Sequence, residues 1–382
     1  MSSLALQRSR WSRFVPRDLR LHDALLLVVL ALIVLGLTMV YSSSAVFAAG
    51  RYKDDAFFFL RQLKFAAMGL AGMAIVAQIP AVWVRKNLRW ILAIGIVLLV
   101  AVLLPGVGKV SGGARRWLPL GFVLVQPAEL AKLLVVLFMA HALARRADGE
   151  NKSSMWVAFG FIQAFAVLVL LERDLGTAFV IELVSLVMLF IAGAKIGPML
   201  VAAVAAVPVL AALIFIEPYR VRRVTAFIDP FTDRQGAGYQ LSEALISLGS
   251  GGWFGLGLGD GRQKLYFLPE AHTDFIFAVV GEELGFLGTI VLITLFTAFL
   301  LLSAAIARRQ KTTFGRFLAL GIGAWIVLQA GVNMCVATGL LPTKGLTLPF
   351  ISYGGSSLIT CCVAVGILYS LAKRGDEAEA AP

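Results

Sequence analysis

The chain has few of the residues that soluble proteins carry on their surfaces. Only 15% of its 382 residues are charged, and it contains three histidines and three cysteines. The cysteines, Cys335, Cys361 and Cys362, fall in apolar stretches without the spacing of a metal-binding motif. We expect them to pack as small apolar side chains. The scarcity of charge excludes an ordinary soluble domain.

Apolar runs long enough to cross a bilayer recur along the whole chain instead. Hydrophobic residues make up 59% of the sequence, and the mean hydropathy is +0.88. We therefore predict an all-α, polytopic membrane protein with about ten transmembrane helices. The predicted spans are 24–41, 57–79, 88–104, 128–144, 156–171, 175–193, 197–216, 273–303, 314–338 and 350–372.

These spans divide the chain into an N-terminal tail (1–23), one ten-helix membrane domain (24–372) and a C-terminal tail (373–382). The main insertion is a large loop over 217–272, between spans seven and eight. The first span could be a cleaved secretory signal, since small residues follow it. Its apolar stretch is too long for that and nine spans follow, so we interpret it as an uncleaved signal anchor.

Basic residues predict the side of the membrane on which each loop lies. Five arginines precede the first span, so the N-terminus is expected in the cytoplasm. Counting spans then places the basic loops after spans two, four, six and eight, and the tail that begins with Lys373, on the same side. We predict a protein of the cytoplasmic (inner) membrane with both termini in the cytoplasm and the 217–272 loop outside.

The outer loops are also rich in basic residues, which topology does not require. They include Lys109, Arg115, Arg116, Arg173, Arg262, Lys264 and Lys344. Contact with anionic lipid headgroups would explain any one of them. The whole set, spread over separate loops, favours a positive outer surface that holds an anionic substrate such as a diphosphate.

Four predicted spans begin at this outer face with a polar first turn. Glu129 and Lys132 in span four are three residues apart, on one side and within pairing distance, although such a pair could simply staple the helix. Asp174 opens span six, Asp274 opens span eight, and PFISYGGSS (349–357) opens span ten. This coincidence predicts a cavity open to the outer leaflet.

Asp274 is the most informative of the acidic residues. A charge near the bilayer centre costs about 2.5–3.5 kcal/mol on insertion scales, so it marks a functional hypothesis by default. Asp274, Glu282 and Gly285 fall on one helical stripe, with Glu282 about 12 Å deeper, too far to act with Asp274 on one bond. We interpret Glu282 and Glu283 as buried structural acids, and Asp274 as an interfacial residue that meets water and a lipid-linked substrate.

The large outer loop is not a simple linker. Residues 239–257 predict a short amphipathic helix followed by a glycine-rich turn that lies along or folds back into the membrane. The glycines lack the setting and the spacing of a nucleotide-binding loop. His272 lies near Asp274 without an obvious nucleophile, so we expect it to be an interfacial hydrogen-bonding residue rather than part of a catalytic triad.

Four motifs together resemble the SEDS family of membrane proteins, whose members polymerise peptidoglycan glycan strands. They are GGARRWLPLG (112–121) with QPAELAK (126–132), ERDLGTA (172–178), LPEAHTDFIFAVVGEELG (268–285) and GLLPTKGLTLPFISYGGSS (339–357). The resemblance covers nearly the whole chain and favours the division branch, FtsW, over the elongation branch, RodA. One departure is Glu172-Arg173, where many relatives carry Gln-Pro.

The resemblance implies glycosyltransfer from lipid II, the undecaprenyl-diphosphate-linked disaccharide pentapeptide, on the outer face of the membrane at the division septum. The family's essential aspartate falls on Asp274, and its polar partners fall on Glu129, Lys132 and Asp174. Our hypothesis is that Asp274 is the general base of an inverting transfer with undecaprenyl diphosphate as leaving group. Lys132 would orient the substrate or tune the site electrostatically.

The candidate substrate-binding residues share a position at the outer face. Cations for the departing diphosphate are Arg115, Arg116, Lys132, Lys264 and Lys344, with a divalent ion (Mg²⁺ or Mn²⁺) as a candidate cofactor. The other candidates are Gln126, Glu129, Asp174, Glu270, His272, Thr273, Ser352, Tyr353, Gly354, Gly355 and Ser356.

Two other functions fit part of the pattern. A lipid II flippase would also use a cationic cavity, but no matching polar set lies on the inner side and no inverted halves are evident. A non-catalytic division scaffold would not need Asp274. The resemblance also implies a cognate class B penicillin-binding protein as transpeptidase, together with other divisome membrane proteins. No nucleic acid partner is expected.

Overall fold

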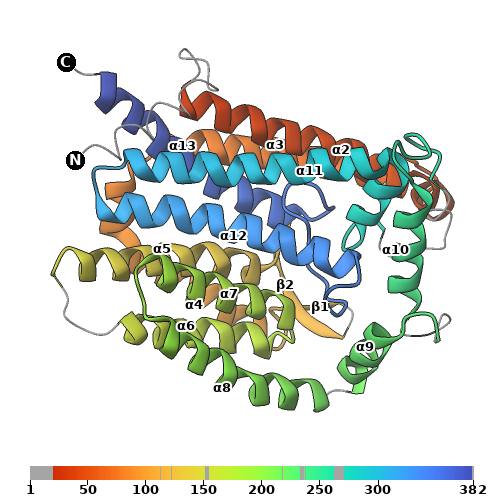
Figure 1. The fold of residues 1–382 in the computed structure, drawn as a ribbon, viewed down its shortest axis with the longest axis horizontal. Helices are drawn as coiled ribbons and strands as arrows, with labels where there is room; N and C mark the ends of the chain where they lie inside the picture. Colours follow the sequence, from red (N-terminus) through yellow and green to blue (C-terminus); the bar gives the residue numbers. More distant parts are fainter. Residues whose placement is uncertain are drawn as a thin grey trace.

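The computed structural model describes residues 20–380 apart from 112, 122, 151–154, 217, 233–235, 237 and 262–270. It is a bundle of long helices that run side by side (Figure 1). Within these residues, seven helices are long and apolar enough to cross a membrane. They are α2 (Leu21–Tyr52), α3 (Phe57–Val76), α4 (Ala81–Leu103), α5 (Pro127–Ala147), α11 (Ile276–Arg309), α12 (Thr313–Ala337) and α13 (Gly355–Ala380).

Three shorter or less completely described apolar helices complete the bundle: α6 (Met155–Leu171), α7 (Leu175–Ile191) and α8 (Ile196–Phe215). Each predicted span coincides with one of these helices, so the all-α, multi-pass membrane fold is confirmed. Of the predicted N-terminal tail, residues 1–19 lie outside the described part of the chain. The predicted C-terminal tail begins inside α13, which continues to Ala380.

The interior of the bundle is formed by α5, α12 and α13, which bury most of their residues. The outer helices expose large apolar side chains, such as Val34, Trp90 and Val291. An exposed apolar surface of this extent is typical of a membrane-facing side.

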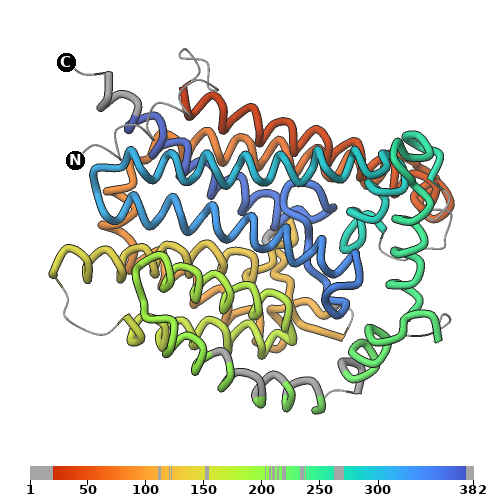
Figure 2. Tube along the Cα trace, in the orientation of Figure 1, coloured from red at the N-terminus to blue at the C-terminus, as the bar shows by residue number. Residues whose placement is uncertain are grey.

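Helices α3 and α13 are distant in the sequence but lie side by side (Figure 2). Glycines make this close approach possible, because a Cβ at Gly366 would lie 2.7 Å from the carbonyl oxygen of Met73. A Cβ at Gly69 would lie 3.0 Å from the Sγ of Cys362. Small residues at helix contacts are the usual way for membrane helices to pack closely. Cys361 and Cys362 are buried there as free thiols, as predicted.

A small antiparallel sheet between α4 and α5 was not predicted. Its strands are β1 (Lys109–Ser111), β2 (Ala114–Leu120) and β3 (Val123–Val125), in the order β1-β2-β3. The sequence analysis expected only a loop in this region. The sheet brings the chain to Gln126, the N-cap residue of α5, and so sets where that helix begins.

The large loop contains two helices, α9 (Pro218–Ile228) and α10 (Tyr239–Ser250). The predicted short helix at 239 is confirmed as α10, which packs against α11, whereas α9 was missed. Helix α10 and the strands lie at one end of the bundle, and the C-terminal turns of α13 lie at the other end (Figure 1).

Helix α11 is not the continuous helix that the sequence predicts. Gly285 has φ 68° and ψ −165°, so two helical segments meet there. The glycine-rich segment after α10 supplies the missing hydrogen bonds: Leu256 N–H donates to the Glu282 carbonyl (2.9 Å), and Phe286 N–H donates to the Gly252 carbonyl (2.9 Å). The stripe from Asp274 to Gly285 is therefore interrupted at its deep end. Helical periodicity could not show this, because the docking segment lies elsewhere in the sequence.

Candidate functional site

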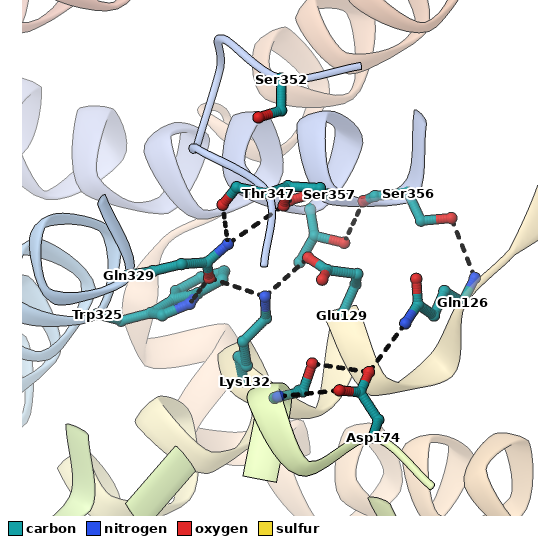
Figure 3. A network of polar contacts seen from close by, with 12 residues as sticks. Gln126, Glu129, Lys132, Asp174, Trp325, Gln329, Thr347, Ser352, Ser356 and Ser357 are labelled. Atoms are coloured by element: carbon teal, nitrogen blue, oxygen red, sulfur yellow. Dashed lines mark hydrogen bonds and ion pairs between the residues drawn. The ribbon is translucent and has the colours of Figure 1, made fainter. Parts of the chain in front are cut away.

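A buried ion pair lies in the first turns of α5. Lys132 Nζ is 2.9 Å from Glu129 Oε2, so the predicted pairing is confirmed. Lys132 is only 2% exposed, and its ammonium also donates to Gln329 Oε1 on α12 at 2.8 Å (Figure 3). A buried charge is stable only when it is paired and hydrogen-bonded, and this lysine has both kinds of partner.

Two amide side chains on α12 connect this pair with the segment that follows the helix. Gln329 Nε2 donates to the Thr347 carbonyl at 2.9 Å. One turn further on, Asn333 Nδ2 donates to the carbonyls of Leu346 (2.6 Å) and Asp274 (2.9 Å). The residues at 329 and 333 are buried on one face of the helix and bind consecutive residues of one extended segment. We did not predict either; their signal is two amides four residues apart in an apolar helix.

Asp274 lies two residues before α11, where it is half-buried. A Cβ on residue 345 would lie 3.1 Å from Asp274 Oδ2, so the glycine at that position leaves room for the carboxylate. The two preceding residues are held through their backbones. Ser352 Oγ donates to the Thr273 carbonyl (2.6 Å), and Tyr353 N–H donates to the His272 carbonyl (2.8 Å).

The residues before α13 form a turn that is itself held from α3. The predicted start of span ten at residue 350 is wrong, because the helix begins at Gly355. Gln62, a buried residue that the sequence analysis missed, donates through Nε2 to the Ser352 carbonyl (3.1 Å). Its Oε1 accepts from Gly354 N–H at 3.3 Å. The turn therefore joins α3 to the residues that precede Asp274.

Asp174 is the N-cap residue of α7 and accepts hydrogen bonds from two helices. Thr177 N–H and Oγ1 both donate to it at 3.0 Å, which satisfies the start of α7. Gln126 Nε2 donates to the same carboxylate at 3.2 Å, and Gln126 N–H donates to Ser356 Oγ at 3.0 Å. The starts of α5, α7 and α13 thus meet in one hydrogen-bonded network (Figure 3).

The predicted outer cations have different surroundings. Arg115 donates to the Leu103 carbonyl at 3.3 Å, and Arg116 donates to the Arg173 carbonyl at 2.6 Å. Lys344 Nζ lies 4.3 Å from the centroid of the Phe179 ring, and burial lowers the pKa of Lys344. Their binding of a diphosphate stays a prediction. Two other candidates, Lys264 and Glu270, lie outside the described residues.

Glu172 is a fully buried acid in the turn before α7. It is 0% exposed, and neither of its carboxyl oxygens has a hydrogen-bond partner among the residues that the structure describes. Burial, and secondarily the charge of Asp174, raises the pKa of Glu172 to about 8, although Arg116 opposes the shift. This carboxyl group is therefore mostly protonated at neutral pH.

His272 is buried, and its role as an interfacial hydrogen-bonding residue stays a prediction. Its ring centroid lies 4.5 Å from that of Phe58 and 5.6 Å from that of Tyr353. The aromatic ring thus packs between α3 and the turn before α13. Its three aromatic partners, Phe47, Phe58 and Tyr353, lie in distant parts of the sequence. The local sequence pattern around His272 therefore could not predict this environment.

Glu282 and Glu283 lie deeper in α11 and are buried, as predicted. Ser247 Oγ donates to Glu282 Oε2 at 2.9 Å. Ser42 Oγ and Gly259 N–H donate to Glu283 at 2.7 Å and 3.2 Å. Among the described residues, no three histidine, cysteine or acidic side chains gather as metal ligands, and the divalent ion stays a prediction.

Residues 23–377 match the FTSW_RODA_SPOVE family, described as "Cell cycle protein". The "Probable peptidoglycan glycosyltransferase FtsW" of Saccharophagus degradans is 46% identical over 360 residues, which cover 92% of each chain. A protein of the same description from Geobacter sp. is 42% identical over 352 residues, 91% of this chain and 96% of the relative.

Solved structures share the fold over nearly the whole chain. One comes from work described as "Structural coordination of polymerization and crosslinking by a peptidoglycan synthase complex". Its matching chain has a TM-score of 0.73 and 28% identity, covering 92% of this chain and 97% of that one. The rod shape determining protein RodA of Thermus thermophilus has a TM-score of 0.67 and 28% identity, covering 91% and 95%.

Proposed function

The chain belongs to the FtsW/RodA/SpoVE family of cell cycle proteins and is a peptidoglycan glycosyltransferase; we propose that it polymerises lipid II during septal wall synthesis. The division role is supported by the curated relatives, which are named FtsW and are 40–46% identical to this chain. The RodA structure of the elongation branch is 28% identical.

The observation that carries this proposal is the hydrogen-bonded network that connects the Lys132 ammonium with the backbone at Asp274, at one end of the bundle. Gln329 links Lys132 to the Thr347 carbonyl, and Asn333 links the carbonyl of the adjacent Leu346 to the carbonyl of Asp274. Charged groups are costly within a bilayer and are retained there mainly for function. A scaffold protein would have no use for this arrangement.

Asp274 is the general base of the proposed reaction. It takes the proton from an acceptor sugar hydroxyl as that oxygen attacks the anomeric carbon of the donor, and undecaprenyl diphosphate leaves with inversion. Asp274 lies just before α11 and is half-buried, and the absence of a side chain at Gly345 makes space for its carboxylate. Positioned general-base catalysis contributes about 10²–10⁴-fold to such a rate.

Lys132 and the two α12 amides have positioning roles. The ammonium of Lys132 is paired with Glu129 and fixed by Gln329, so it orients substrate or tunes the field at the site. Asn333 and Gln329 set the spacing between this ammonium and the backbone at Asp274. Arg115, Arg116, Lys264 and Lys344 supply positive charge for the departing diphosphate.

A class B penicillin-binding protein is the proposed transpeptidase partner, within a larger group of divisome membrane proteins at the septum. Support comes from the structural neighbour, whose description couples polymerization with crosslinking in one complex. The proposed orientation has both termini in the cytoplasm, which puts the Asp274 end of the bundle outside, where lipid-linked precursor is consumed.

The test is polymerisation of lipid II by the purified full-length protein in vesicles, with and without the partner. Glycan strands that require this protein are the expected product. Transport of lipid II across the vesicle membrane without polymer would overturn the proposal in favour of a flippase. No polymer with the active partner present would favour a scaffold.

A further inference from the structure

A cavity lies at the end of the bundle opposite Asp274. It has a volume of about 520 Å³ and lies between α2, α3 and α13. Its lining residues come from the start of α2 and the ends of α3 and α13, whereas the candidate site lies at the opposite ends of the same helices. This cavity plays no part in the proposed glycosyltransfer.

The lining combines an apolar wall with a cationic rim. Met73, Ala74 and the ring of Tyr369 contribute to the wall, and Lys373 and Arg374 lie at the rim. Among the residues whose side chains the structure describes, no acidic residue lines the cavity. A group that binds here must therefore carry negative charge at one end and be apolar at the other.

The rim is held in place by hydrogen bonds between α13 and the turn after α3. Ser370 Oγ donates to the Ile79 carbonyl at 2.7 Å, and Arg374 Nη2 donates to the Gln78 carbonyl at 3.3 Å. Within the described part of the chain, Arg374 donates to this carbonyl, which leaves other guanidinium donors for a ligand, and the exposed Lys373 lies beside it. The cations are thus placed at the mouth of the cavity rather than spread over a surface.

We propose that this cavity binds an anionic phospholipid of the cytoplasmic leaflet, with its phosphate at Lys373 and Arg374 and an acyl chain along Met73 and Ala74. Basic pockets between helices on the cytoplasmic side are suited to acidic headgroups. The chain's own N-terminal segment is an unsuitable occupant, because its five arginines before Leu21 would be repelled by the rim. Only the choice of leaflet depends on the orientation proposed above.

The test is lipid retention by the purified full-length protein in native mass spectrometry. Detergent-solubilised protein is titrated with phosphatidylglycerol or with phosphatidylcholine that has the same acyl chains. We expect about tenfold preferential retention of phosphatidylglycerol. The double variant Lys373→Ala/Arg374→Ala should lose this preference.

Two further variants separate a built site from general charge attraction. Ala74→Trp fills the cavity without removing charge and should also lose the preference; if that variant does not fold, Ala74→Leu gives the same comparison. Arg308→Ala/Lys311→Ala removes two exposed cations at the cytoplasmic end of α11, outside the cavity. This variant should keep the preference for phosphatidylglycerol. The proposal would be overturned if both Ala74 variants still preferred phosphatidylglycerol. It would also be overturned if the Arg308→Ala/Lys311→Ala control lost this preference to the same extent as the Lys373→Ala/Arg374→Ala variant. The readout is independent of polymerisation, so it does not depend on the proposed activity.

Discussion

Two of the groups of buried acidic residues in the described part of this bundle differ in what they connect. Glu129 is paired with Lys132 and, through Gln329, reaches the extended segment beside Asp274. Glu282 and Glu283 instead accept hydrogen bonds from serines and from the glycine-rich segment that docks into the break of α11. The first group thus contains an ion pair between ionisable residues. The second group binds the glycine-rich segment after α10 to helix α11.

Residue type and depth do not distinguish the two groups, because both consist of acids buried in apolar helices. The difference lies in the geometry around them. Asp274, beside the first group, is half-buried, whereas Glu282 and Glu283 are 0% and 1% exposed. A substrate can approach a partly exposed carboxylate, and it cannot approach a fully buried one.

The largest difference in polymerisation and stability is expected between Lys132→Met and Glu283→Gln. Lys132→Met leaves Glu129 buried without its counter-ion, which should cost about 3–5 kcal/mol of stability and lower polymerisation at least about 100-fold. In Glu283→Gln, the side-chain oxygen can still accept a hydrogen bond from Ser42. The polymerisation rate of this variant should therefore stay within about threefold of wild type. The measurements are lipid II polymerisation and thermal unfolding.

The double variant Glu129→Leu/Lys132→Met separates stability from activity in the first group. Removing both charges avoids an unpaired ion and should restore most of the stability while the protein stays inactive. Wild-type polymerisation by this variant would show that the pair only staples the helix.

The next contrast concerns the amides of α12. Asn333→Asp replaces the donor that binds the Asp274 and Leu346 carbonyls with an acceptor. We expect kcat to fall about 10–100-fold while KM for lipid II stays within about threefold, because the residue positions the base and does not bind substrate. Gln310→Glu is the matched control, since Gln310 also donates to two backbone carbonyls, those of Ile306 and Leu371, at the end of the bundle opposite Asp274. An equal loss of activity in both variants would contradict the positioning role.

The break in α11 can be tested with two glycine substitutions. Gly285→Ala should lower stability by about 2 kcal/mol or more, because φ is 68° and the new Cβ would collide with the backbone of Phe254 and Gly255. Gly331→Ala, in α12, has no atom within 4 Å of its new Cβ and should be neutral or slightly stabilising. The measurement is thermal unfolding in detergent. Equal stability of the two variants would show that the break is not needed to dock the loop.

The smallest effect concerns the pH dependence that Glu172 contributes. Its pKa is raised from 4.5 to about 8 in the folded protein, so the folded state holds the proton more tightly than the unfolded state. Stability from this group is therefore greatest below about pH 4.5, falls as the pH rises to about 8, and changes no further above that. Glu172→Gln lacks this titration, so its unfolding temperature relative to wild type should rise between about pH 5 and about pH 9. A constant difference across this range would refute the assignment.

The sequence was sufficient for the helices and for the ion pair, because both depend on local spacing. Long apolar runs predict spans whatever surrounds them, and Glu129 and Lys132 share a helix face by periodicity alone. The break at Gly285 and the buried ring of His272 could not be predicted in this way. Each depends on a partner far away in the sequence, Gly255 in one case and Phe58 in the other.

The amides of the site were missed for a related reason. Gln62, Gln329 and Asn333 carry no charge. Gln329 and Asn333 interrupt an apolar helix only as single residues, and Gln62 lies between Arg61 and Lys64, whose charges explain a polar stretch without it. The importance of these amides comes from the backbone carbonyls and N–H groups that they bind, which belong to turns whose conformation the sequence does not reveal. The small sheet before α5 was overlooked because its outer strands have only three residues each.

The most direct test of the central claim compares Asp274→Asn with Glu283→Gln and wild type in polymerisation of lipid II by purified, folded protein. The account predicts that Asp274→Asn folds but loses strand synthesis by about 10²–10⁴-fold, whereas Glu283→Gln makes normal glycan strands. Normal glycan ladders from Asp274→Asn would contradict it.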